Sequence, residues 1–188
     1  MAFMSEDQLQ AMGFKSFGRN VKISDKVSFY NCNQIEIGDN SRIDDFCVVS
    51  GLIKIGRNVH ITIFCNIAGG IFGVYIDDYA TIAYGCHIFS QSDDYSGASM
   101  TNSTIPQRYK NEKKEAVRIG KFCIIGARSI ILPGVIVAEG CSIGAMSLVN
   151  RSTDPWGIYF GIPSVRHKDK ARMPLLIVTE YERENDPI

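Results

Sequence analysis

The sequence has no excess of either charge and no long apolar run. Its 20 basic and 20 acidic side chains cancel, so nothing favours binding to nucleic acid or to a membrane surface. No apolar stretch approaches the roughly 20 residues of a membrane span. The opening from Met1 to Asp7 lacks the basic start and apolar stretch of a secretory signal. We therefore expect a cytoplasmic protein with neither nucleic acid nor membrane as a partner.

Ile or Val, by contrast, recurs at every sixth position. The first long run comprises Ile37, Ile43, Val49, Ile55, Ile61 and Ile67, and the second comprises Ile119, Ile125, Ile131, Val137, Ile143 and Val149. A period of six is typical of a parallel β-helix with three short faces per coil, whose inward β-branched side chains stack between coils. We expect an all-β fold of about six coils, with an excursion loop and short terminal helices.

The chain also lacks any Cys-x-x-Cys pair, although it contains 6 cysteines. Five of them stand four residues after a repeat Ile or Val: Cys47, Cys65, Cys86, Cys123 and Cys141. Ser and Val fill the same slot elsewhere, so we interpret these cysteines as small buried hydrophobes rather than disulfides or ligands. The three histidines lack the close pairing of a zinc site, and no metal is expected.

Three segments are predicted along the chain. Residues 1–16 hold a capping helix, which a Ser5/Gln8 capping box starts and Gly13 ends. Residues 17–154 form the β-helix, interrupted at 89–118 by a polar loop where a functional site is expected. Residues 155–188 form a C-terminal segment and tail. Four apolar residues of the tail suggest a helix face that covers the last coil: Leu175, Leu176, Val178 and Tyr181.

Several stretches resemble a known family. The hexads and the segments IGARSIILPGVIV (125–137), IGAMSLV (143–149) and GIPS (161–164) are similar to the hexapeptide acyltransferases, which are left-handed parallel β-helix enzymes. Within that family, GFKS (13–16), IDDF (43–46), SDDYSG (92–97) and TIPQRYKN (104–111) are most similar to N-acyltransferases of nucleotide-linked 4-amino-4,6-dideoxysugars.

The resemblance implies a left-handed helix and an enzyme. Its expected reaction moves acetyl from acetyl-CoA to the 4-amino group of a dTDP-linked 4-amino-4,6-dideoxyhexose, namely dTDP-4-amino-4,6-dideoxy-D-glucose, in O-antigen and lipopolysaccharide biosynthesis. The resemblance also implies a homotrimer with active sites between subunits.

One departure from the wider family concerns the excursion loop. Sugar O-acetyltransferases of the family carry a catalytic His there, whereas this loop holds Asp93 and Asp94 and no His. A hydroxyl nucleophile needs a general base, but a neutral amine needs positioning and loss of a proton. The missing His therefore favours an amine substrate. We expect Asp93 or Asp94 to orient or deprotonate it, with water or the departing thiolate as other proton acceptors.

Further site residues are predicted around the loop and the last coils. The candidates for the sugar nucleotide are Asn66, Tyr84, Ser90, Tyr95 and Arg108. The resemblance assigns to acetyl-CoA the residues Gly126, Ala127, Gly144, Ala145, Gly161, Ile162, Pro163, Arg166 and Lys168. The glycines and alanines of this second set could instead be ordinary corner residues. Residues 161–163 could be only a turn, and Arg166 and Lys168 could be part of a solvated basic run.

Two other functions stay open at this point. One is a sugar O-acetyltransferase that uses acetyl-CoA. The other is a non-enzymatic or metal-binding β-helix protein.

Overall fold

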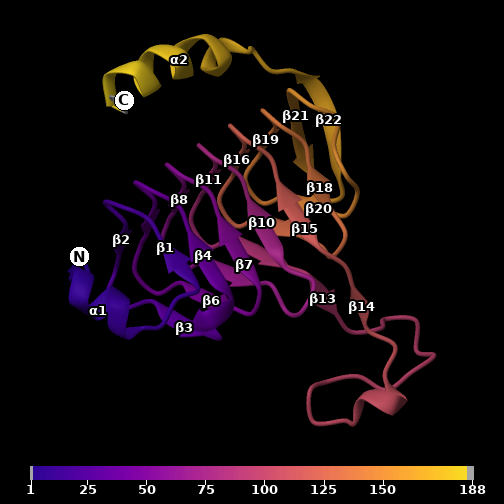
Figure 1. Cartoon of the computed structure of the whole chain (residues 1–188). Helices are drawn as coiled ribbons and strands as arrows, with labels where there is room; N and C mark the ends of the chain where they lie inside the picture. Colours follow the sequence, from indigo (N-terminus) through magenta and orange to yellow (C-terminus); the bar gives the residue numbers. More distant parts are fainter. Residues whose placement is uncertain (1, 186–188) are drawn as a thin grey trace.

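Short parallel strands stack into a three-faced prism in the computed structural model, which describes residues 2–185 (Figure 1). The first face contains β1 (Ser16–Phe17), β4 (Ile35–Ile37), β7 (Ile53–Ile55), β10 (Val74–Ile76), β15 (Val117–Ile119) and β18 (Ile136–Val137). The second face contains β2 (Lys22–Ile23), β5 (Arg42–Ile43), β8 (His60–Ile61), β11 (Thr81–Ile82), β16 (Ile124–Ile125), β19 (Ser142–Ile143), β21 (Gly157–Gly161) and the antiparallel β22 (Ser164–Asp169). The third face contains β3 (Ser28–Tyr30), β6 (Val48–Ser50), β9 (Asn66–Ala68), β12 (His87–Phe89), β17 (Ile130–Ile131) and β20 (Leu148–Val149).

The period of six sets the register of these strands. On the first face Ile55 pairs with Ile76, and Ile76 with Ile119, so that equivalent side chains stack through the prism. The repeat Ile and Val residues are almost completely buried, and each fully buried side chain contributes about 1.5–3 kcal/mol. The predicted parallel β-helix is confirmed. The strand β21 continues the second face beyond residue 154, where the sequence predicted the β-helix to end.

Two corners of the prism repeatedly use a left-handed backbone. Between the first and second faces, the corner residues with positive φ include Asn20, Asn40, Asn58, Tyr79, Phe122 and Trp156. Between the second and third faces they are Phe46, Phe64, Gly85, Arg128 and Met146. Their side chains therefore project outward and form ladders, in which Phe46 and Phe64 stack 5.2 Å apart.

The five cysteines of the repeat are buried, and all six thiols are free. The thiol of Cys47 lies 3.0 Å from the carbonyl oxygen of Thr62, and that of Cys123 lies 3.0 Å from the carbonyl of Ala138. These contacts join neighbouring corners, which confirms the predicted structural role. Within residues 2–185, no group of three or more His, Cys, Asp or Glu side chains is placed to hold a metal ion.

The N-terminal helix α1 (Glu6–Ala11) has the predicted capping box. The amide of Gln8 donates to Ser5 Oγ, and the amide of Ser5 donates to Gln8 Oε1 at 2.8 Å. Gly13 ends the helix with a φ of 69°, and Leu9 packs into the core. A short 3-10 turn, η1 (Cys32–Gln34), lies between β3 and β4.

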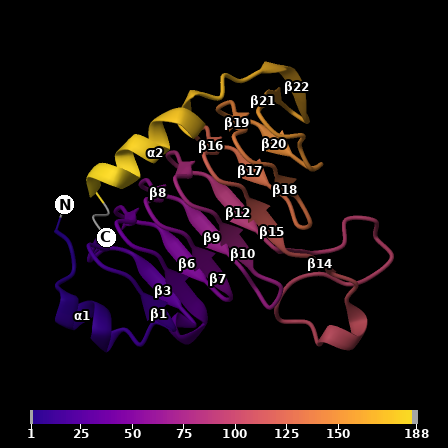
Figure 2. The ribbon, with the colours of Figure 1, turned by 45° about the horizontal axis from the view of Figure 1, so that its top comes forward.

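The C-terminal helix α2 (Met173–Asn185) does not cover the last coil, so that prediction is wrong. It runs back along the corner between the first and second faces (Figures 1 and 2). Tyr181 donates to Asn58 Oδ1 at 3.0 Å and meets the ring of Tyr79 edge-on. Leu175 and Leu176 remain exposed. Among the described residues, no helix is long and apolar enough to cross a membrane.

The excursion loop leaves the prism after β12 and returns at β15. Two antiparallel strands, β13 (Gln91–Ser92) and β14 (Lys113–Lys114), form its neck. Beyond them the chain includes the 3-10 turn η2 (Gln107–Tyr109). Figures 1 and 2 both show the loop projecting away from the stack of coils.

Candidate active site

The two aspartates of the loop directly follow β13, but their surroundings differ. Asp94 accepts a bond from the amide of Ser96 at 2.9 Å on Oδ1 and one from Ser99 Oγ at 3.0 Å on Oδ2. Hydrogen bonds from Ser96 and Ser99 hold the pKa of Asp94 below its ordinary value. Both carboxylate oxygens of Asp94 thus organise the turn that follows it.

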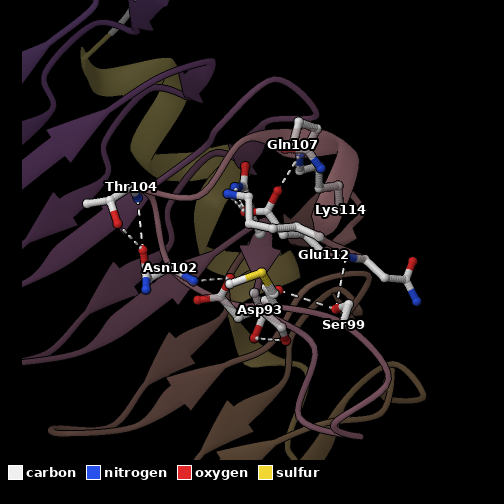
Figure 3. Close-up of polar contacts among 12 residues, drawn as sticks. Asp93, Ser99, Asn102, Thr104, Gln107, Glu112 and Lys114 are labelled. Carbon is white, nitrogen blue, oxygen red and sulfur yellow. Dashed lines mark hydrogen bonds and ion pairs between the residues drawn. The ribbon is translucent and has the colours of Figure 1, made fainter.

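Asp93 keeps one carboxylate oxygen free. Its Oδ1 accepts a bond from the amide of Asn102 at 3.2 Å (Figure 3). Within residues 2–185 no donor contacts its Oδ2. Asn102 has a positive φ of 74° and also receives bonds from Thr104. Asp93 is therefore oriented from one side and available to a ligand on the other.

An ionic cluster holds the neck of the loop. Glu112 accepts hydrogen bonds from Gln91 Nε2 at 2.7 Å and Lys110 Nζ at 3.3 Å, and it forms an ion pair with Lys114 Nζ at 2.8 Å. Lys114 also donates to Gln107 Oε1 at 3.2 Å. Mainly because of the Lys114 contact, the pKa of Glu112 falls to about 2. We refer to these five residues as the neck cluster.

The residues predicted to line the sugar pocket are spread over three places. Tyr95, which is 92% exposed, and Arg108, which stacks on Tyr109 at 4.6 Å, lie in the loop. Asn66 is half-buried on the third face beside His87. Tyr84, 58% exposed, stands at the corner between the second and third faces.

Ser90 differs from its prediction. Its side chain is only 1% exposed, and its hydroxyl donates to the carbonyl of Gly69. Its own carbonyl accepts the amide of Glu115 at 3.0 Å. Ser90 therefore fixes the base of the loop and presents no hydroxyl to a ligand.

The small residues predicted to contact CoA form one corner, which we call the alanine corner: Gly126, Ala127, Gly144 and Ala145. The structure explains both glycines by packing between coils. A Cβ on Gly126 would lie 2.5 Å from the amide nitrogen of Ala145, and one on Gly144 would lie 2.8 Å from the Cβ of Phe160. The glycines thus allow close stacking.

The two alanines offer a different feature. The amide of Met146 donates to the carbonyl of Ala127 at 2.8 Å. The amide of Arg128 donates to the carbonyl of Tyr84, also at 2.8 Å. Tyr84, Ala127 and Ala145 therefore follow one another along the corner. Inside the described part of the chain, the amides of Ala127 and Ala145 donate to no acceptor. Ala145 is exposed. The corner therefore presents free backbone donors beside small side chains.

The tip of the β21–β22 hairpin adjoins the alanine corner. The amide of Gly161 donates to Ser147 Oγ at 3.2 Å, and the peptide bond between Ile162 and Pro163 is cis. Ile162 is 72% exposed. The predicted turn GIPS thus stands beside Ala145 as one wall of this region.

Arg166, predicted to contact CoA, makes three contacts within its own part of the chain. Its guanidinium donates to the carbonyl of Asp154 and to Tyr159 Oη, and it pairs with Asp169 at 2.8 Å. The contact with Asp169, followed by that with Tyr159, raises the pKa of Arg166. Its guanidinium is therefore already paired, and a role toward CoA stays a prediction. Lys168 is exposed on β22 opposite Ile158.

Sequence reasoning missed the neck cluster and one aromatic pair. Glu112 and Lys114 stand in a stretch of mixed charge, and only the antiparallel pairing of β13 with β14 brings them to Gln91. His167 packs on Phe160 with ring centroids 4.6 Å apart, close to Gly144. No local pattern marks either arrangement, because both depend on contacts that form only in the folded chain.

Comparisons with known proteins agree with this arrangement. The family model described as "Bacterial transferase hexapeptide (six repeats)" matches residues 116–151. The dTDP-4-amino-4,6-dideoxy-D-glucose acyltransferase of Escherichia coli is 48% identical over 185 residues, which cover 97% of this chain and 96% of that protein.

Solved structures of AntD, an N-acyltransferase from Bacillus cereus, show the same fold. One, in complex with dTDP and 3-hydroxybutyryl-CoA, has a TM-score of 0.96 and 41% identity and covers 98% of each chain. Another, a variant in complex with dTDP-4-amino-4,6-dideoxyglucose and Coenzyme A, has a TM-score of 0.96 and 42% identity, with 97% of each chain covered.

The fold and the repeat define a hexapeptide-repeat acyltransferase. Within that class, the chain belongs to the family of the dTDP-4-amino-4,6-dideoxy-D-glucose acyltransferase and AntD.

Proposed function

We propose that this protein transfers an acetyl group from acetyl-CoA to the 4-amino group of dTDP-4-amino-4,6-dideoxy-D-glucose. The observation that carries the proposal is similarity over the whole chain, excursion loop included, to the Escherichia coli enzyme and to AntD. A scaffold protein would need only the coils. Participation in O-antigen biosynthesis and a cytoplasmic location suit these substrates and remain predictions.

The chemistry needs little from the protein beyond placement. The neutral amine attacks the thioester carbonyl, a tetrahedral intermediate forms, and CoA leaves as thiolate. The free amides of Ala127 and Ala145 are suitable donors to the acyl-CoA arm or to the developing oxyanion. Asp93 orients the amine through its free oxygen. The proton passes to Asp93, to water or to the departing thiolate.

A homotrimer is part of the proposal. The loop projects away from its own prism (Figures 1 and 2). The alanine corner lies in the last coils, where β16 leads to β17 and β19 to β20, and the tip of the β21–β22 hairpin follows them in the chain. Asp93 and the alanine corner therefore meet most simply when they come from neighbouring copies. Closed cyclic symmetry is the common way to repeat such a contact.

The identity of the transferred acyl group is a separate part of the proposal. Acetyl is the group that the sequence resemblance suggests, whereas AntD is known with 3-hydroxybutyryl-CoA. Steady-state rates with both thioesters at equal concentration decide between them. A higher kcat/KM with 3-hydroxybutyryl-CoA would replace acetyl as the natural group and leave the amine acceptor unchanged.

The proposed function is tested by measuring the release of CoA with two acceptors, one that carries a 4-amino group and one that carries a 4-hydroxyl group. Purified protein, acetyl-CoA and dTDP-4-amino-4,6-dideoxy-D-glucose should release CoA, and the sugar nucleotide with a 4-hydroxyl group should not. Release with the hydroxy sugar alone would favour the O-acetyltransferase. No release with either sugar, together with no thermal stabilisation by millimolar acetyl-CoA, would favour a non-catalytic β-helix.

A further inference from the structure

The neck cluster places one carboxylate between two ammonium groups in a nearly closed setting. The side chains of Lys110 and Glu112 are only 7% and 6% exposed, and that of Lys114 is 23% exposed. Charged side chains are rarely buried to this degree without a specific partner. Here Glu112 is the common partner of both lysines.

A second ion pair in the same stretch provides the contrast. Lys113 and Glu115 approach to 3.7 Å, but their side chains are 56% and 57% exposed. Exposed pairs of this kind contribute at most about 1 kcal/mol. The chain thus alternates between a buried pair at the neck and a solvated pair beside it.

The neck cluster lies within a few residues of Asp93. In the β13–β14 pairing, Gln91 stands opposite Lys114 and Ser92 opposite Lys113, and Asp93 is the next residue. On the far side, Met100 bridges to Lys110, and the amide of Asn111 donates to Ser99 Oγ at 3.1 Å. Figure 3 shows Glu112 and Lys114 in the same close-up as Asp93 and Ser99. The chain before the aspartates is therefore tied to Glu112 through Gln91, and the chain after them is tied to Lys110 and Asn111, next to Glu112.

We propose that Glu112 is a positioning residue, which closes the neck of the excursion loop and thereby fixes Asp93 where the acceptor amine binds. The inference rests on the proposed function for its catalytic half only. The structural half, closure of the neck by one buried carboxylate, is measurable without any substrate.

The physical reason is an imbalance of buried charge. Without its carboxylate, the neck would hold two lysines whose ammonium groups have lost their common anion. Removing one member of a buried ion pair is far more costly than removing an exposed one, because the remaining charge must be hydrated. Hydration of the buried Lys110 ammonium, and fuller hydration of that of Lys114, favours opening of the neck.

The test compares Glu112→Gln with the matched exposed variant Glu115→Gln. Amide hydrogen exchange of residues 91–114 should become about tenfold faster in Glu112→Gln, because the neck opens more often. It should change less than about twofold in Glu115→Gln. Unchanged exchange in Glu112→Gln would overturn the proposal.

Kinetics separate positioning from a general structural role. In Glu112→Gln, kcat with the amino sugar should fall about tenfold, while KM for acetyl-CoA and the melting temperature stay near those of the native protein. A higher KM for acetyl-CoA together with a lower melting temperature would instead assign Glu112 to general stability. Faster exchange with unchanged kcat would confine its role to the loop and refute the link to Asp93.

A double variant supplies the rescue. Lys110→Met combined with Glu112→Gln removes one of the orphaned cations, and exchange and kcat should recover part of the loss seen in Glu112→Gln. No recovery would contradict the charge-imbalance argument. If the native protein acetylates no amino sugar, the proposed function fails, but the exchange experiment still decides whether Glu112 closes the neck.

Discussion

Two adjacent aspartates in the loop show how hydrogen bonds separate residues that are indistinguishable in the sequence. Asp94 uses both oxygens within its own turn, whereas Asp93 uses one. A carboxylate that already accepts two hydrogen bonds from its own loop would have to give up one of them to bind a ligand, and the turn would loosen. The two aspartates therefore differ: Asp94 is bound within its own turn, and Asp93 has one oxygen available to a ligand.

The first residue-scale prediction concerns that difference. Asp93→Asn should lower kcat by about a hundredfold, because the amine loses its charged acceptor while the bond from Asn102 can persist. Stability should hardly change. Asp94→Asn should instead loosen the turn at Ser96 and Ser99. Steady-state kinetics and melting temperatures check both. A larger kcat loss in Asp94→Asn, with native loop exchange, would reverse the assignment.

The second residue-scale prediction concerns Gly126. A methyl group there would lie 2.5 Å from the amide nitrogen of Ala145 and 2.7 Å from the carbonyl carbon of Gly144. Backbone cannot retreat as a side chain can, so Gly126→Ala should destabilise the protein by about 1–3 kcal/mol. Thermal unfolding measures the loss. Gly97 has no neighbouring atom within 4 Å but has a φ of 82°. Gly97→Ala therefore introduces backbone strain without a clash, and a smaller shift of its melting temperature would isolate the clash at Gly126.

At the level of elements, the sequence predicted the strands and a C-terminal helix, but not the place where α2 docks. A strand of the prism is specified by its own inward residue, such as Ile76 between Ile55 and Ile119. The place where α2 docks depends on partners more than 100 positions away, such as Asn58 for Tyr181. An apolar helix face indicates that the helix packs on another part of the protein, but it does not identify that part.

The same limit applies to the excursion loop. Its length and polarity indicated a functional segment, and the two aspartates were identified from the motif. The neck cluster was not, because Gln91 and Glu112 are 21 positions apart and meet only after β13 and β14 pair. A repeated spacing of residues predicts the contacts between coils. It does not predict contacts between distant residues within one irregular loop.

A prediction at this scale concerns the attachment of α2. Glu182 accepts bonds from Arg57 at 2.5 Å and from Tyr79 Oη at 2.8 Å, and burial together with this contact raises the pKa of Tyr79 to about 12. Tyr79 therefore remains a donor at neutral pH. Glu182→Gln should accelerate amide exchange in α2 about threefold to tenfold. The exposed variant Glu180→Gln should not, and equal effects would argue against this anchor.

At the scale of the whole molecule, the prism separates two parts of the proposed site. The excursion loop, whose first residues after β13 include Asp93, projects away from the stack of coils (Figures 1 and 2). Ala145 lies at a corner of the last coils, between β19 and β20. The period-six pattern established the prism from the sequence. It contains no information on which neighbour completes the site, since that depends on how copies associate.

Mixed oligomers test this arrangement. Asp93→Asn removes the acidic group, and Ala145→Phe fills the exposed alanine corner, so each variant alone should be nearly inactive. If the site forms between copies, co-refolded mixtures should regain activity at about a quarter of the sites, by random association. A site built within one chain predicts no recovery. Mass measurement in solution should show a trimer for both variants.

The central claim, acyl transfer to nitrogen, is tested most directly by identifying the acetylated atom. The acceptor dTDP-4-amino-4,6-dideoxy-D-glucose, labelled with a heavy nitrogen isotope at the 4-amino group, is incubated with acetyl-CoA and the protein and followed by NMR. The account predicts a new amide N–H resonance, coupled to the labelled nitrogen, that grows as CoA is released. Acetyl ester signals at a sugar hydroxyl, with the labelled amine unchanged, would contradict it.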